Sequence, residues 1–458
     1  MPLTSSCKRA IVPTALALLA LPTVMPTNAA ETPGGGSIEL RGLHRARYER
    51  LSPQYRAGLG GSDTVLALQT SLVLEANWPK LSFMGELLDA RAELNDSDSV
   101  FAGVVNTLEP IQTYLTWKIG DASNDDGSQS SLRVGRLTMD LGKRRLLARS
   151  NFRHAVASFA GADWQWQNSR GTRLRAFYVV PMRTLPATSA ELLDNDAELD
   201  RGARDTVLSG AYYLSAPGTN LRQLELSFLK LDSANGAGEI APQDIDTWSM
   251  RVFRPVERSR INYEIEAGIQ RGDSAAGQSN PLVWLEHDAY YAHAEIGYAP
   301  DLAWTPNILL QYDVASGDRD PTDNKNERFN PLFGERRFDT GPTSIYGAFQ
   351  RSNIASPGVR VTFNPAPRWR AMVAYRDFKL DAARDAWVGS GWRDPTGQAG
   401  SSLGRQLEGS ATWNALADRL TIEAGLAHTH MGRFARQTAG AAFRGSPDYF
   451  YAGLAVNF

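Results

Sequence analysis

The sequence is 458 residues long and almost balanced in charge, with 48 Lys and Arg residues against 50 Asp and Glu residues. This length fits two or three soluble domains or one large barrel. The absence of a strong basic excess argues against nucleic acid as a partner. Mean hydropathy is negative (−0.33), which does not exclude a membrane protein, because transmembrane strands place apolar side chains only at every second position.

The N-terminus has the pattern of a secretory signal peptide. Lys8 and Arg9 precede an apolar run over residues 10–25, and Thr27-Asn28-Ala29 supplies small residues for cleavage. We therefore expect residues 1–29 to be removed, with a retained membrane anchor as the alternative. The only cysteine, Cys7, lies in this segment, so disulfides, thiolate metal sites and cysteine nucleophiles are excluded from the mature chain.

Residues 30–36 contain three consecutive glycines and predict a flexible lead-in, followed by one domain over residues 37–458. In that domain apolar and polar residues alternate with the period of two that strands require. Between Arg260 and Gln270, for example, Ile and Tyr residues occupy one face and Asn, Glu and Gln the other. Eighteen such segments are predicted, at 37–50, 64–77, 80–92, 108–119, 131–139, 154–166, 172–181, 205–214, 221–231, 246–254, 260–270, 285–298, 304–314, 357–364, 368–378, 403–413, 420–430 and 447–458.

Short connections rich in Pro, Gly, Asn and Asp alternate with long polar ones along the whole domain. Bacterial outer-membrane barrels have short periplasmic turns and long extracellular loops, so the alternation predicts such a barrel. The expected fold is therefore all-β, a transmembrane antiparallel up-and-down barrel of about 18 strands in the outer membrane of a Gram-negative bacterium. Trp and Tyr residues near the strand ends fit the aromatic girdles that border the lipid.

Polar residues opposite the apolar faces would line the lumen, and Glu264, His293, Glu295 and Arg376 are among those expected to face inward. Basic residues, among them Arg136, Arg173 and Arg175, lie on the predicted strands five to seven, whereas the predicted strands nine to twelve carry mainly Glu. A basic wall opposite an acidic wall would orient polar solutes, and the planar guanidinium group of Arg pairs with carboxylates in a bidentate manner. This chemistry suits sugar acids.

The longest predicted loop, residues 315–356, contains Asp318, Asp320 and Asp323. Clustered carboxylates are ligands that calcium prefers, but the spacing departs from the EF-hand pattern, so a solvated acidic loop is the main interpretation. The length of the loop also allows it to fold into the channel and narrow it.

The last predicted strand alternates apolar and mixed residues and ends on an aromatic one. Tyr451, Gly453, Val456 and Phe458 have the spacing of the C-terminal signal that the bacterial barrel-assembly machinery recognises. With eighteen strands both termini fall on the periplasmic side, and residues 447–458 should close the barrel against residues 37–50.

Three groups of residues, in this order, resemble the bacterial alginate export family of outer-membrane porins. The first is the basic run from Gly135 to Arg153, followed by Phe159-Ala160-Gly161. The second is Tyr312–Asp318 followed by Phe329–Phe333. The third is Gln406-Leu407-Glu408 with Thr412-Trp413, then Glu423-Ala424-Gly425. Leu137 and Ala160 stand where the family often has Gln and Asp.

The resemblance implies a monomeric barrel of eighteen strands with an arginine-rich, anion-selective constriction that passes a polyuronate chain. Carried over by position, the expected pore residues are Arg136, Arg145, Arg149 and Arg153, with Arg91 and Arg370 as further candidates. The expected partners are outer-membrane lipid, the barrel-assembly machinery and an acidic polysaccharide or sugar acid. The many inward Glu residues keep a general small-solute porin open as an alternative.

An enzyme is the less favoured class. The sequence has no His-x-Ser pair of a barrel phospholipase, no Gly-x-Ser-x-Gly nucleophile turn and no Walker loop. A barrel hydrolase or adhesin whose loops carry the function remains an alternative. No catalytic residue, cofactor or metal is expected, and the sequence does not distinguish export from uptake.

Overall fold

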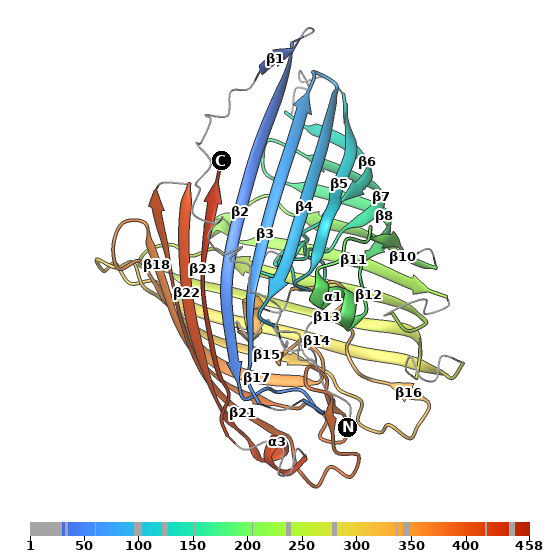
Figure 1. Ribbon diagram of the computed structural model, residues 1–458, viewed down its shortest axis with the longest axis vertical. Helices are drawn as coiled ribbons and strands as arrows, with labels where there is room; N and C mark the ends of the chain where they lie inside the picture. Colours follow the sequence, from blue (N-terminus) through green and yellow to red (C-terminus); the bar gives the residue numbers. More distant parts are fainter. Residues whose placement is uncertain are drawn as a thin grey trace, which may run out of the picture.

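A computed structural model of the chain describes residues 30–32, 35–59, 61–95, 103–120, 127–150, 152–203, 205–234, 240–276, 282–335, 337–341, 348–416, 419–438 and 445–458. The chain forms a closed antiparallel β-barrel of eighteen strands. Short turns connect the strands at one rim of the barrel, and long loops connect them at the other (Figure 1). The predicted signal peptide lies outside the described residues.

The barrel strands have these bounds: β2 (Gly36–Ser52), β3 (Asp63–Asn77), β4 (Leu81–Glu93), β5 (Asn106–Ile119), β6 (Gln129–Leu137), β7 (Phe159–Gln167), β8 (Arg173–Arg183), β10 (Thr206–Leu214), β11 (Gln223–Ser233), β12 (Gln243–Arg254), β13 (Ile261–Ala275), β14 (Trp284–Tyr298), β15 (Asn307–Ala315), β17 (Ile354–Phe363), β18 (Trp369–Lys379), β21 (Ser402–Leu416), β22 (Leu420–Met431) and β23 (Asp448–Asn457). Each pairs with its neighbours in sequence, as expected of an up-and-down barrel.

The barrel closes where the first and last of these strands meet. β2 pairs with β23 over ten residue pairs, from Leu43 opposite Asn457 to Ser52 opposite Asp448. Beyond that register Gly42 and Phe458 exchange backbone hydrogen bonds of 2.6 and 2.9 Å. The predicted partner of the last strand is therefore confirmed.

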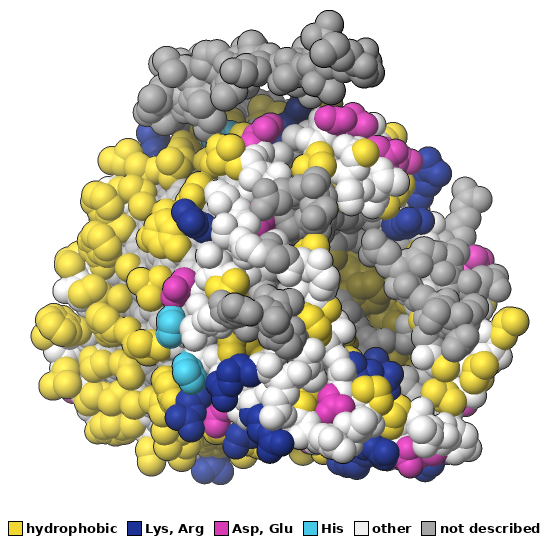
Figure 2. Space-filling view, turned by 60° about the horizontal axis from the view of Figure 1, so that its bottom comes forward, with side chains coloured by type: hydrophobic (Ala, Val, Ile, Leu, Met, Phe, Trp, Pro, Cys, Tyr) yellow, Lys and Arg dark blue, Asp and Glu magenta, His cyan; other side chains and the backbone are white. Residues whose placement is uncertain are grey.

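Outward positions of the strands are largely apolar, whereas inward positions carry buried polar groups together with an apolar cluster that includes Phe159, Val179 and Leu208. On β13, Ile261, Ile265 and Ile269 are exposed on the outside, while Glu264 and Gln270 are buried inside. On β23, Phe450 and Leu454 are exposed and Tyr451 is fully buried. The exposed apolar side chains form the large yellow face in Figure 2. An apolar belt of this kind suits contact with lipid.

Aromatic residues predicted to form girdles lie on this outer face. Trp117 and Tyr298 are exposed at the short-turn ends of β5 and β14, and Trp304 is exposed in the short turn between β14 and β15. Trp369 and Trp413 stack there with ring centroids 5.4 Å apart. These positions fit the membrane–water boundary, where the amphipathic rings are favoured.

Several predicted strand bounds differ from the observed ones by a few residues. The largest differences are at β13, which ends at Ala275 instead of residue 270, and at the start of β7. β7 begins at Phe159 instead of residue 154, because residues 154–158 belong to a loop inside the barrel, where His154 is buried. The expected flexible lead-in contains the short strand β1 (Ala30–Thr32), whose residues pair with Gly36–Ile38 of β2.

Small elements lie in the connections. They are α1 (Ser189–Asp194), β9 (Arg201–Gly202), η2 (Thr219–Leu221), β16 (Lys325–Asn326), α2 (Arg337–Thr340), β19 (Ala386–Trp387), β20 (Trp392–Arg393) and α3 (Arg433–Thr438). Among the described residues, the helices are all too short or too polar to cross a membrane as helices.

Candidate functional site

Two long loops fold into the lumen and meet there. They are the β6–β7 loop (described residues 138–150 and 152–158) and the β15–β17 loop (described residues 316–335, 337–341 and 348–353). Ala148 N donates to Phe333 O and Phe333 N donates to Leu146 O, both at 3.0 Å, so the loops pair edge to edge like parallel strands. The rings of Phe159 and Phe333 pack edge to face, 5.3 Å apart. The sequence-based suggestion that the long loop 315–356 narrows the channel agrees with this geometry.

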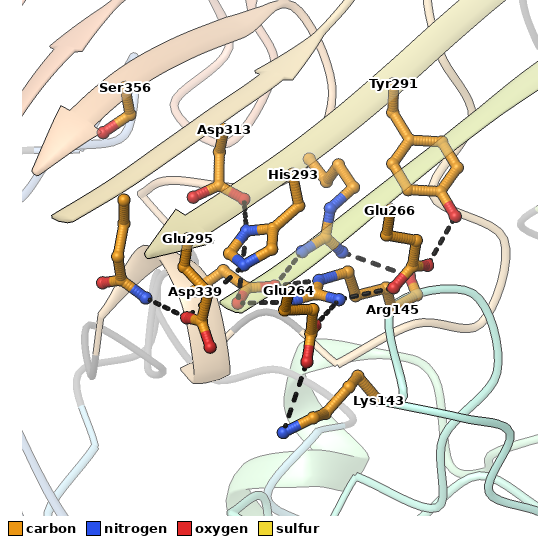
Figure 3. A network of polar contacts seen from close by, with 12 residues as sticks. Lys143, Arg145, Glu264, Glu266, Tyr291, His293, Glu295, Asp313, Asp339 and Ser356 are labelled. Carbon is orange, nitrogen blue, oxygen red and sulfur yellow. Dashed lines mark hydrogen bonds and ion pairs between the residues drawn. The ribbon is translucent and has the colours of Figure 1, made fainter. Parts of the chain in front are cut away.

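Arg145, at the tip of the β6–β7 loop, joins both loops to the barrel wall (Figure 3). Its guanidinium donates to Glu264 at 2.5 Å and to Glu266, two inward carboxylates of β13. It also donates to Asp339 of α2 at 2.9 Å. All four side chains are buried, so these charge-assisted bonds act at low dielectric and hold the loops in place.

Asp339 is shared among several arginines. Besides Arg145 it accepts from Arg351 of the same loop, and its backbone carbonyl accepts from Arg376 of β18. Burial by itself would raise the pKa of Asp339, but Arg145 and Arg351 together hold that pKa well below its usual range. Burial likewise opposes the charge of Arg145, and its carboxylates more than compensate, so the pKa of Arg145 rises well above its ordinary value. Both groups are therefore charged at all physiological pH values.

The wall beside Asp339 carries a second polar chain. Arg376 donates to Asp313 of β15 at 2.5 Å and to Ser356 Oγ at 2.9 Å. Asp313 lies 2.7 Å from Nδ1 of His293, and Glu295 lies 3.6 Å from Nε2 of the same imidazole. Sequence alternation identified His293, Glu295 and Arg376 as inward residues, and the structure confirms that these three face the lumen.

The predicted pore arginines of the basic run lie within this part of the barrel, and Arg136, Arg145 and Arg149 bind carboxylates there. Arg149 forms a two-point contact with Glu86 of β4, at 2.6 and 2.8 Å. Arg136, at the end of β6, contacts Glu109 and, at 2.7 Å, Asp200. Around Arg153, the carbonyl accepts from Arg45 at 2.8 Å, and burial, with a contribution from Arg56, lowers the pKa of the guanidinium.

The two remaining arginine candidates lie elsewhere. Arg91 is on the outward face of β4, with the exposed Leu87, and contacts Asp89 at 3.0 Å. The assignment of Arg91 to the pore wall is therefore not retained. Arg370 is on the inward face of β18, on the same side as Arg376, and is exposed near the short-turn rim. Arg145 and Arg149 thus lie near the contact between the two lumenal loops, whereas Arg370 lies near the short-turn rim.

Asp318, Asp320 and Asp323 are not gathered into a calcium site. Asp320 accepts from Thr322 at 2.7 Å and Asp323 from the backbone of Lys325 at 2.8 Å, which are contacts of tight turns. In the described part of the chain, the one cluster of three potential metal ligands is His293, Asp313 and Asp339. Because Arg145, Arg351 and Arg376 already compensate these carboxylates, the cluster does not need a cation.

Two cavities flank the β6–β7 loop inside the barrel. The larger, of about 930 Å³, reaches the short turns at Pro79 and Gly120 and is lined by four basic and two acidic side chains: Lys118, Arg173, Arg175, Arg251, Asp140 and Glu225. The smaller, of about 440 Å³, is lined by four arginines and three glutamates: Arg45, Arg47, Arg144, Arg360, Glu335, Glu408 and Glu423. Both linings carry a basic excess.

Sequence reasoning missed the carboxylate that organises the constriction. Asp339 lies in a loop without periodicity, 194 positions from Arg145, so no local pattern points to it. Arg47 was also missed: it is buried on β2, donates to Glu49 at 2.7 Å and stacks 3.7 Å from the ring of Phe152. An arginine at an inward position of an alternating strand was the available signal for Arg47.

A closed eighteen-stranded barrel with an apolar belt and a charged lumen defines an outer-membrane channel of the porin type. Solved structures with this fold include OccK8 (OprE) of Pseudomonas aeruginosa, with a TM-score of 0.58 and 12% identity, covering 92% of this chain and 98% of that chain. The outer membrane protein OpdK of P. aeruginosa has a TM-score of 0.57 and 14% identity over the same shares. OccAB3 of Acinetobacter baumannii has a TM-score of 0.57 and 12% identity, covering 92% and 99%.

The sequence itself places the channel in a family. Residues 38–446 match the family model described as alginate export, so the chain belongs to the alginate export family of Gram-negative outer-membrane proteins. No curated protein sequence matches the chain.

Proposed function

We propose that this outer-membrane channel prefers anions and passes an acidic polysaccharide or sugar acids. The observation that carries the proposal is the path of the basic run between β6 and β7. It enters the lumen and brings Arg145 and Arg149 close to the contact between the two loops. The guanidinium groups already bind carboxylates there in bidentate fashion, which is the chemistry that a uronate requires.

The internal carboxylates do not contradict this proposal. They occupy the arginines while no solute is present and can be exchanged for carboxylates of a passing chain, so that each arginine keeps a partner throughout. Such exchange lowers the cost of leaving a buried charge unpaired. The basic excess in both cavity linings supports accumulation of anions on either side of the β6–β7 loop.

Planar-bilayer recording tests the proposal. We expect an anion preference and block by uronate oligomers in the natural protein. Arg136→Glu together with Arg149→Glu should shift the reversal potential toward cation selectivity, and the milder pair Arg136→Gln with Arg149→Gln should do so by less. Arg258→Glu, in an exposed turn outside the lumen, is the matched control. Unchanged selectivity in both double variants, with folded protein, would remove these residues from the conduction path.

A small-solute porin is the second candidate, favoured by the loops that meet across the lumen. A chain can pass only if those loops move apart, whereas small sugar acids need less space. Liposome-swelling rates distinguish the two functions. Similar rates for a uronate monomer and a tetramer support polysaccharide passage, and exclusion of the tetramer supports the small-solute channel.

A further inference from the structure

The larger lumenal cavity has the features of a binding site at the short-turn mouth, separate from the constriction. Its lining comes from the inward faces of β5 to β8 and β10 to β12, where these strands approach the short turns. In outer-membrane barrels short turns face the periplasm. A solute arriving from the periplasm therefore meets this cavity before it reaches Arg145.

Most charges in the cavity are already compensated by the protein. Arg251 donates to Glu264 at 2.9 Å and contacts Glu225. Arg175 donates to Asp163 at 2.6 Å and to the carbonyl of Asp140 at 2.8 Å. These contacts fix the floor of the cavity, so Arg251 and Arg175 themselves contribute little to the recruitment of a ligand.

In the part of the chain that the structure describes, two cations of the cavity lining have no carboxylate within ion-pair distance. Lys118 of β5 donates only to the carbonyl of Trp78, at 3.2 Å, among the contacts of the described residues. Arg173 of β8 is exposed to the cavity, and its side chain forms no ion pair or hydrogen bond with any residue that the structure describes. Since other inward arginines such as Arg145, Arg149 and Arg376 are held by carboxylates, Lys118 and Arg173 differ from them in being available to a ligand.

Neutral groups of the same lining suit a sugar. Gln129 and Gln167 face inward from β6 and β7 and are joined by an amide hydrogen bond of 3.3 Å, which is weak enough to exchange. Ser131 and Tyr212 add hydroxyl groups to the lining. Amides and hydroxyls bind sugar hydroxyl groups, and a cavity of about 930 Å³ is large enough for a few sugar rings.

We infer that this cavity is a periplasmic capture site for carboxylated sugars, in which Lys118 and Arg173 bind the carboxylates and the amides bind hydroxyl groups. The inference rests on the proposed function and deepens it, because it gives the channel a side from which acidic sugars enter. Recruitment occurs at the short-turn mouth, and the constriction then selects what passes.

The test is side-specific block of single channels in a planar bilayer, with a mannuronate tetrasaccharide as the charged probe and maltotetraose as the uncharged one. We expect the mannuronate oligomer to block at lower concentration from the short-turn side than from the long-loop side. Lys118→Gln with Arg173→Gln should raise the blocking concentration on the short-turn side by about tenfold, as loss of two charge contacts in water predicts. Maltotetraose should not distinguish the sides.

Arg258→Gln is the matched control, because it removes a positive charge from the same rim outside the cavity. Correct folding is verified by heat-modifiable migration in gels. Equal block from both sides, or a double variant that behaves like Arg258→Gln, would overturn the capture site while anion preference and block persist. Absence of anion preference and of block from either side would instead overturn the proposed function itself.

Discussion

Replacement of Asp339 by Asn should loosen the β15–β17 loop without a large change in volume. Asp339 is fully buried and accepts charged hydrogen bonds from Arg145 and Arg351. Asn keeps one acceptor oxygen but loses the negative charge. Arg145 keeps its ion pairs with Glu264 and Glu266, so it loses only one of its three carboxylate partners. Among the described contacts Arg351 has no second carboxylate.

The magnitude follows from the cost of breaking buried ion pairs. Removal of one partner of a buried ion pair costs about 3–5 kcal/mol. Because Asn keeps one acceptor oxygen and Arg145 keeps Glu264 and Glu266, the cost of Asp339→Asn should be about 3 kcal/mol. Since 1.4 kcal/mol corresponds to a factor of ten, the equilibrium between the packed and released loop should shift by roughly 100-fold. An opening that is rare in the natural protein should become frequent.

Single-channel recording gives the readout as the frequency and duration of openings. Asp320→Asn is the control, since Asp320 belongs to the same loop but is exposed and, among the described residues, contacts only its own turn and Arg384. If Asp339→Asn opens no more often than Asp320→Asn, the ion pairs at Asp339 do not hold the loop, and the reasoning fails. The low pKa of Asp339 also predicts that the natural protein keeps this contact from neutral to mildly acid pH, because the stabilisation is lost only as pH falls through that depressed pKa.

Two further predictions concern other parts of the barrel. Burial, with a contribution from Glu109, raises the pKa of Asp200 to about 6, so this carboxyl should take up a proton between pH 7 and pH 5 and leave Arg136 with Glu109 alone. Anion selectivity should therefore rise as pH falls through 6, and Asp200→Asn should abolish that part of the pH dependence in reversal-potential measurements; an unchanged profile would contradict the assignment. At the seam, a side chain on Gly42 would overlap the Phe458 ring, with 2.2 Å between a Cβ atom and the nearest ring carbon. Gly42→Leu should lower the fraction of folded, heat-modifiable protein, whereas Gly85→Leu, where a Cβ meets only a Phe83 ring at 3.2 Å, should lower it less.

The barrel was predictable because its determinants are local and repeated. Alternation along each strand identified all eighteen barrel strands and the inward position of residues such as Glu264 and Arg376. The start of β7 was predicted too early, at residue 154. Residues 154–158 directly precede the alternating residues of β7 in the sequence, but they belong to a loop that packs inside the barrel. Arg91 was misassigned because a basic residue near a strand end can face either side.

The constriction was only partly predictable, for a different reason. Arg145 and Arg149 stand out in a basic run, but their partners come from β4, β13 and α2, far away in sequence. The periodicity of a single sequence reports which residues share a strand face, but it does not report which distant residues a loop contacts. The charge balance inside the lumen therefore became visible only in three dimensions.

The backbone bonds between Ala148, Leu146 and Phe333 make the two lumenal loops a single cooperative unit. Neither loop can leave the lumen without breaking the hydrogen bonds of the other, and partial withdrawal would leave buried polar groups without partners. The interior therefore has few stable intermediate positions. Current traces from such a channel should switch between two levels in one step, instead of climbing through a ladder of partial conductances.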